Sequence, residues 1–141
     1  MRIILLIIIL LINGCGPDPI DGSNTPESAV LGFFQAIYID NNVDGAKEFV
    51  TPELAELLQH YYLASQIQRH VFSLPMTQVK LKILEVELDF LRKSSDVTTV
   101  IIKFDGLKGG KVWVDDRKVK IRKIRGRWII TDFIAETNVR G

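Results

Sequence analysis

Cysteine is almost absent from this chain: Cys15 is the one cysteine among 141 residues, so no internal disulfide can form. The sequence also lacks the motifs of common catalytic sites. It contains no Gly-rich phosphate loop after an expected strand, no Ser-nucleophile signature, and no His/Asp/Glu cluster with metal-ligand spacing. Lysine plus arginine number 18 against 17 aspartate plus glutamate, so net charge gives no reason to expect nucleic-acid binding. We predict no catalytic residue, no metal site and no cofactor.

The apolar run near the N-terminus is too short to cross a membrane. Ile3–Ile12 contains only isoleucine and leucine, follows Arg2, and precedes Asn13-Gly14-Cys15. A transmembrane helix needs about 20 such residues, and a surface helix would need a polar face. A positive charge, a short apolar core and a small-residue break are the parts of a secretory signal peptide. We therefore predict that residues 1–14 direct export.

The cleavage region narrows this prediction. Ile12-Asn13-Gly14-Cys15 resembles the lipobox of bacterial lipoproteins, in which an aliphatic and a small residue precede an obligatory cysteine. The resemblance implies cleavage between Gly14 and Cys15, followed by acylation of Cys15 and anchoring to a membrane. The alternative is an ordinary signal peptide with an incidental cysteine, but one unpaired thiol in an exported protein calls for an explanation. Gly16 after the cysteine implies the outer membrane, facing the periplasm, if the cell has two membranes.

The residues after Cys15 divide into a linker and a domain. Residues 16–25 are rich in proline, glycine and small polar types, so residues 15–25 are predicted to be the lipidated cysteine and a flexible tether. Residues 26–141 are enough for one globular domain with its own core.

Two similar segments predict where helices begin. Thr25-Pro26-Glu27 and Thr51-Pro52-Glu53 each offer a capping threonine, a proline in the first turn and an acidic residue. Apolar residues then recur at helical spacing, which predicts one helix ending at Asp40-Asn41-Asn42 and another running from Pro52 to about Ser73. A short helical segment over 43–50 brings the expected number to three.

After Pro75 the apolar pattern changes to the alternation of strands. We predict strands over 79–90, 97–104, 111–124 and 128–134. Phase slips near Ile83-Leu84 and around Asp115-Asp116 are interpreted as β-bulges, because a one-residue slip exchanges the two faces of a strand. Gly106 to Gly110 and Arg125-Gly126 are the expected turns. Helices followed by antiparallel strands predict an α+β domain with its helices on one sheet face.

This order of elements resembles the NTF2-like superfamily of α+β domains, in particular its small bacterial lipoprotein and secreted branches. The resemblance extends from about Thr25 to Phe133. It rests on Thr25–Val30 with Phe33–Ala36, on the short helix before Thr51–Leu54, and on Arg125–Ile130. It implies an NTF2-like roll with three helices packed on a curved four-stranded antiparallel sheet. A cystatin-like or other α+β roll is the alternative.

The resemblance also implies a pocket between helices and sheet, which relatives use for apolar ligands or catalysis. The expected lining residues are Phe34, Tyr38, Tyr62 and Trp113. Enzymatic relatives place a base and an acid in this pocket, and the residues of suitable type here are Tyr38, Tyr61, Tyr62, His60, His70 and Asp132. The tyrosines fall on apolar stripes, which favours packing in the core with the hydroxyl at the rim. His60 and His70, ten residues apart on one expected helix, are predicted to form no paired site.

Charges are balanced overall but separated along the sequence. Nine basic residues lie within Lys108–Arg127, and eight acidic residues lie between Asp18 and Glu56. In Lys118-Val119-Lys120-Ile121-Arg122 the cations alternate with apolar residues, so they share one face of a strand. A solvated outer face explains this pattern. The alternative is a basic patch for acidic lipid headgroups, an anionic envelope polymer or a protein partner.

Together these features predict a membrane-anchored envelope lipoprotein with a non-catalytic binding or interaction domain. Nucleic acid is disfavoured as a partner by the expected export. A small-molecule carrier or enzyme that uses the pocket, and a structural subunit of an envelope assembly, are the alternatives.

Overall fold

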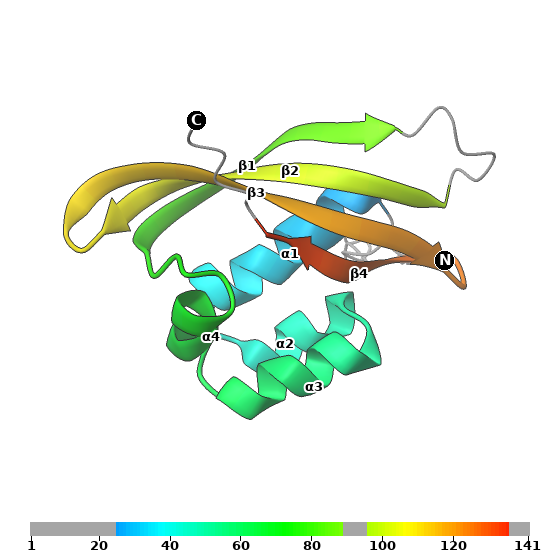
Figure 1. The fold of residues 1–141 in the computed structure, drawn as a ribbon, viewed down its shortest axis with the longest axis horizontal. Helices are drawn as coiled ribbons and strands as arrows, with labels where there is room; N and C mark the ends of the chain where they lie inside the picture. The colour runs from blue at the N-terminus through cyan, green and yellow to red at the C-terminus, as the bar shows by residue number, and fades with distance from the viewer. Residues whose placement is uncertain (1–24, 89–95, 136–141) are drawn as a thin grey trace, which may run out of the picture.

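The computed structural model describes residues 25–88 and 96–135 (Figure 1). The expected signal peptide, Cys15, most of the expected tether and Phe90 of the first expected strand lie outside these residues.

The helical half contains α1 (Pro26–Tyr38), α2 (Val43–Ala46), the 3-10 turn η1 (Lys47–Phe49), α3 (Pro52–Tyr61) and α4 (Ala64–His70). Both predicted helix starts are confirmed. The Ser28 backbone N–H donates to the Thr25 hydroxyl over 3.1 Å, and the Leu54 N–H donates to the Thr51 hydroxyl over 3.4 Å. Each bond satisfies a backbone donor that the first turn of a helix leaves without a partner.

The prediction of one helix from Pro52 to Ser73 is wrong, and with it the number of three helices. The chain breaks at Tyr62, whose φ of 65° lies outside the helical region, and α4 begins two residues later. Leu58 before the break and Ile67 after it are both fully buried. Because α3 and α4 pack on the same core, the apolar stripe continues across the break and hides it.

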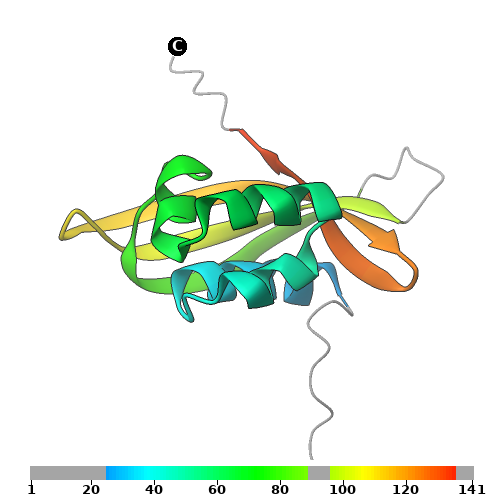
Figure 2. The same cartoon turned by 90° about the horizontal axis from the view of Figure 1, so that it is seen from below.

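Four antiparallel strands form an open sheet in the order β1 (Thr77–Leu88), β2 (Val97–Lys108), β3 (Lys111–Ile124) and β4 (Arg127–Ile134). Figures 1 and 2 show the helices gathered on one face of this sheet. The predicted α+β class with helices on one face is therefore confirmed.

Two details of the sheet differ from the predictions. The bulge near Ile83-Leu84 is confirmed by a register shift between Ile83 and Glu85. The pairing of β2 with β3 has no shift at Asp115-Asp116; the other register shifts lie between Thr77 and Lys80 in β1 and between Lys120 and Ile121, where β3 pairs with β4. Gly106 belongs to β2, and only Gly109 and Gly110 form the turn. The alternation of β3 continues without a slip, because Asp115 is a polar residue on the inner face.

Aromatic side chains fill the space between α1 and the sheet. Phe33, Phe34 and Phe104 are fully buried, and the Phe34 and Phe104 rings meet edge to face with centroids 5.1 Å apart. Phe72 and Phe133 extend this cluster, 4.9 Å apart. Rings packed in this way contribute to stability beyond the area they bury.

A buried glutamine joins α4 to its neighbours. The Gln68 side chain is 6% exposed; its amide donates to the Ile37 carbonyl over 3.1 Å, and its oxygen accepts from the Met76 N–H over 3.3 Å. Because buried amides must be hydrogen-bonded, Gln68 fixes the end of α1 against the start of β1.

Candidate functional site

A cleft of about 640 Å³ lies beside β3, between the strand and the segment that follows α4. Aromatic rings and polar groups line it together. Its walls are formed by Phe34, Val71, Phe72, Ser73, Lys108, Trp113, Val114, Asp115, Arg117, Lys118, Val119, Phe133, Ile134 and Ala135. The apolar floor is thus the outer side of the aromatic core, and β3 supplies the polar wall.

Among the described residues, no strand covers one edge of β3 along this cleft. β4 pairs with β3 only from Lys118 to Ile124, whereas β2 pairs with β3 from Lys111 to Arg122. Within the described residues, the segment Lys111–Arg117 therefore has a neighbouring strand on the β2 side alone. A strand edge of this kind presents backbone donors and acceptors that a further strand can pair with.

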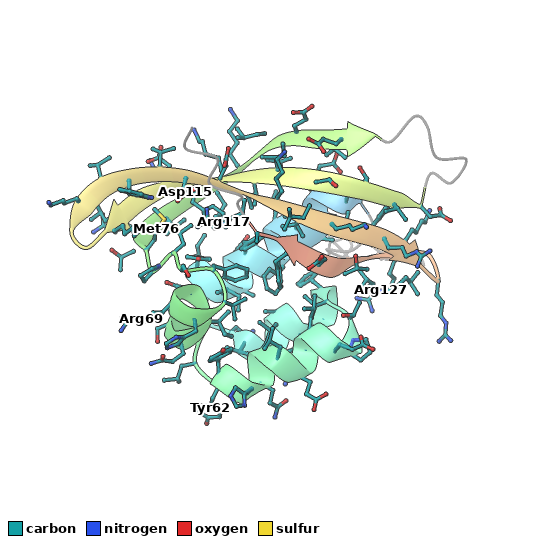
Figure 3. The ribbon with its side chains drawn as sticks, viewed as in Figure 1. Tyr62, Arg69, Met76, Asp115, Arg117 and Arg127 are labelled. Atoms are coloured by element: carbon teal, nitrogen blue, oxygen red, sulfur yellow. The ribbon has the colours of Figure 1, made fainter. Side chains whose placement is uncertain are left out.

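An ion pair forms part of the cleft wall (Figure 3). Arg117 Nη1 lies 2.7 Å from Asp115 Oδ1, and the two side chains are 15% and 18% exposed. The same guanidinium donates to the Phe72 carbonyl over 3.2 Å. Arg117 thereby joins β3 to the segment after α4. Its positive charge also balances the negative charge of the half-buried Asp115 carboxylate.

Trp113 stands at the outer end of the cleft. Its indole N–H donates to Asp115 Oδ2 over 3.2 Å, and the Lys108 ammonium lies 4.4 Å from the ring centroid. Trp113 is 42% exposed, and its neighbours Val112 and Val114 are 79% and 57% exposed. This end of the β2–β3 hairpin therefore combines an oriented aromatic ring with exposed aliphatic side chains.

The structure brings together two of the four residues predicted to line a pocket. Phe34 and Trp113 line the cleft, but Tyr38 and Tyr62 do not. Tyr38 is buried below it and donates its hydroxyl to the Leu74 carbonyl over 2.8 Å. Tyr62 is 79% exposed and lines a separate hollow of about 590 Å³ beside Asn41 and Gln59. The break between α3 and α4 puts it there.

Burial controls the protonation of Tyr38. Loss of solvent raises the pKa of its hydroxyl above the usual value, the Arg117 cation acts in the opposite direction, and Asp115 raises it again. Tyr38 therefore stays protonated at neutral pH and keeps its hydrogen bond to Leu74. This agrees with the predicted core position, although the hydroxyl is buried rather than at a rim.

The remaining residues of suitable type for catalysis lie away from the cleft. Asp132 is exposed and pairs in register with Lys120 across β3 and β4. The Tyr61 ring stacks on His70 with centroids 5.5 Å apart and meets His60 edge to face at 5.3 Å. Both histidines thus contact one tyrosine, an arrangement that a single straight helix would not allow. Within the described residues, no group of three or more His, Cys, Asp or Glu is placed to hold a metal ion.

The basic segment divides between the two faces of the sheet. Val119 and Ile121 are buried while Lys118, Lys120 and Arg122 are exposed, which confirms the predicted alternation. Lys118 lies 3.7 Å from the Glu87 carboxylate, and Arg117 points into the cleft. The segment is therefore not one uniform patch.

Sequence comparison gives no family: no family model and no curated protein matches the chain. Three solved structures match the chain. RPA3114, a SEC-C motif protein from Rhodopseudomonas palustris, has a TM-score of 0.58 at 20% identity over 82% of this chain and 80% of its own. TraH from the Gram-positive conjugative plasmid pIP501 has a TM-score of 0.48 at 16% identity, covering 79% and 93%. A designed β-sheet protein has a TM-score of 0.43 at 12% identity, covering 78% and 82%.

At these identities the likeness to RPA3114 concerns the fold alone. None of the three proteins is described as an NTF2-like domain or as a lipoprotein. No helix in the described parts of the chain is both long and apolar enough to span a bilayer.

Proposed function

We propose that this protein is an envelope lipoprotein, anchored through Cys15, whose NTF2-like domain is a non-catalytic module that binds an extended segment of another polypeptide. The observation that carries the binding proposal is the edge of β3 over Lys111–Arg117, which runs along the cleft and which no strand of the described ranges covers. The lipobox-like segment carries the anchoring proposal.

The edge suits a peptide better than a compact ligand. A peptide that pairs with an exposed strand gains affinity from main-chain hydrogen bonds and specificity from pockets for alternate side chains. Lys111–Arg117 supplies the strand, and the Trp113 and Phe133 rings in the adjoining cleft supply an apolar contact for a side chain of the peptide. The exposed Val112 and Val114 would gain cover from the added strand.

The charges of the cleft indicate the composition of the bound segment. Lys108 and Arg117 line it against one carboxylate, Asp115, which is already paired with Arg117. Lys118 also borders the cleft, but its ammonium lies 3.7 Å from the Glu87 carboxylate. A peptide that combines apolar residues with an acidic residue would complement both the rings and the excess of positive charge.

Two features support binding rather than the carrier or enzyme alternatives. Aromatic side chains of the core already occupy the space under the sheet where an enclosed pocket would have to lie. The ionisable pair in the cleft is joined by hydrogen bonds to Trp113 and the Phe72 carbonyl, so it holds the wall in place.

A peptide selection tests the proposal. A library of random peptides is selected on the immobilised chain from residue 15 onward, carrying Cys15→Ser, and the enriched peptides are titrated by isothermal calorimetry. We expect acidic-apolar peptides whose binding perturbs the backbone amides of Lys111–Arg117 in NMR spectra. Trp113→Ala should lower the affinity for these peptides by about tenfold or more, as truncation of an aromatic anchor does.

The matched control is Tyr62→Ala, which removes an exposed aromatic ring from the other hollow. It should leave peptide affinity unchanged. Peptides that bind equally well to the Trp113→Ala variant, or that perturb the amides around Tyr62 instead, would show that the β3 edge is not the site.

A further inference from the structure

The turn between β3 and β4 carries a concentrated positive charge. Arg122, Lys123, Arg125 and Arg127 lie within six residues that contain no acidic residue, and all four are exposed. Ile124, in the middle of this group, is 41% exposed. We call residues 122–127 the basic tip.

Three of these cations are available to an external partner. Among the residues that the structure describes, Arg122, Lys123 and Arg125 form no ion pair, whereas Arg127 interacts within the domain. Acidic side chains toward this end of the described structure include Glu27 in the first turn of α1, Glu87, which lies 3.7 Å from Lys118, and Asp96, which has an interaction of its own. The basic tip therefore keeps an excess of positive charge.

The start of α1 lies at the same end of the molecule as the basic tip. The far end of α1 packs on the middle of the sheet, where Tyr38 and Phe104 have ring centroids 5.0 Å apart. Phe104 pairs with Asp115, toward the β2–β3 turn, whereas Val97 pairs with Arg122. Both views agree that α1 begins on the side of the β3–β4 turn (Figures 1 and 2). The chain preceding Thr25 therefore joins the domain at its most basic end.

We propose that the basic tip docks on anionic phospholipid headgroups and orients the domain on the membrane. Cations attract an anionic lipid surface, and a neighbouring exposed apolar side chain adds affinity by entering the interface. The position of the basic tip beside the lipid anchor rests on the proposed function. The attraction of its cations to anionic headgroups does not require acylation.

This orientation places the cleft away from the bilayer. β3 has 14 residues and so separates its two turns by roughly 45 Å. Trp113 and the open strand edge lie toward the β2–β3 turn, at the opposite end from the basic tip. A domain that stands on the basic tip presents its cleft to the aqueous side, where a peptide can reach it.

The two ends of β3 allow a matched test of vesicle binding. The chain from residue 15 onward, with Cys15→Ser to exclude acylation, is floated with phosphatidylcholine vesicles that contain or lack phosphatidylglycerol. We expect binding only to the anionic vesicles, and loss of that binding at high salt. Lys123→Glu with Arg125→Glu should reduce the partition coefficient by more than about tenfold.

The control is Lys108→Glu with Lys111→Glu, which makes the same change in net charge at the opposite turn. It should reduce binding by less than about twofold. Equal losses in the two double variants would show that only overall charge matters. A loss confined to the control, or equal binding to both kinds of vesicle, would equally overturn the basic tip as the docking site. Circular dichroism confirms that both variants fold, and acyl labelling of Cys15 tests the anchor separately.

Discussion

Single residues decide how closely β1 and β2 approach, and Gly106 is the clearest case. A Cβ atom at this position would lie 2.7 Å from the Thr77 carbonyl oxygen and 2.9 Å from that of Gln78. Both contacts are to backbone, which cannot rotate away. We expect Gly106→Ala to lower the free energy of unfolding by about 1–3 kcal/mol, measured in urea, because overpacking forces the strands apart.

The control for this prediction is Lys103→Ala, on the opposite face of the same strand. It should change stability by less than about 0.5 kcal/mol, as surface substitutions do. If Gly106→Ala were as stable as this control, the close approach of β1 to β2 would be wrong. The sequence could not reveal that approach, because Gly106-Leu107-Lys108-Gly109-Gly110 has the composition of a turn. Only the bulged backbone around Gln78 shows why β2 needs a glycine at position 106.

The candidate site was predictable where a residue belonged to a periodic stripe. Phe34 follows the helical spacing of α1, and it lines the cleft as predicted. The Asp115–Arg117 pair was missed, because a charged residue on the inner face of a strand looks like a phase slip. The sequence feature that indicates this pair is the unbroken alternation of Trp113, Asp115, Arg117 and Val119 along one face of β3. The alternation can be interpreted as charged side chains on the inner face only when that face of β3 is known to border a cleft.

At the scale of elements, the break between α3 and α4 can be tested by a glycine substitution at Tyr62. Glycine should stabilise the protein if the chain breaks there, and it should destabilise the protein if one helix continues through this position. Tyr62 adopts φ 65° and ψ −46°, a conformation costly for any residue with a side chain. Because its side chain is 79% exposed, Tyr62→Gly removes the strain and little packing. We expect the variant to be more stable by about 0.5–1 kcal/mol, after the larger entropy of glycine in the unfolded chain is counted.

Thermal unfolding followed by circular dichroism measures this change. Gln59→Gly, within α3, is the matched control and should lose about 1 kcal/mol, as glycine does in a helix interior. A loss of stability in Tyr62→Gly of the same size would mean that the helix continues through this position. The predicted strands were more accurate than this helix, because a period of two is disturbed at once when a strand bends, whereas a helical stripe survives a break between two helices on one core.

At the scale of the whole molecule, the charge separation seen along the sequence becomes a separation in space. Residues 25–76, which hold the helices, carry six acidic and two basic residues, a net charge of −4. The described strand residues, 77–88 and 96–135, carry seven acidic and twelve basic residues, a net charge of +5. With helices on one face of the sheet, the domain has an acidic and a basic side. The nearly neutral net charge of the whole chain therefore does not reveal this separation of charge, which would favour one orientation of the domain at a charged surface.

That polarity matters for function only if the chain is held at a membrane, so the last prediction concerns Cys15. Each buried acyl methylene contributes about 0.8 kcal/mol, and stable anchoring needs more than one chain. We expect Cys15→Ala to abolish labelling by an alkyne-tagged fatty acid, and to leave the protein either soluble or as an unprocessed precursor. Ser23→Ala, within the expected tether, should be labelled and should fractionate with membranes as the unsubstituted protein does. Acyl labelling and membrane fractionation that persist unchanged in Cys15→Ala would show that Cys15 is not the anchored residue. If instead the label is lost but the processed protein still fractionates with membranes, the basic tip would have to hold the domain at the bilayer alone. High salt would then release the protein from isolated membranes, which it cannot do to a chain anchored by two acyl groups.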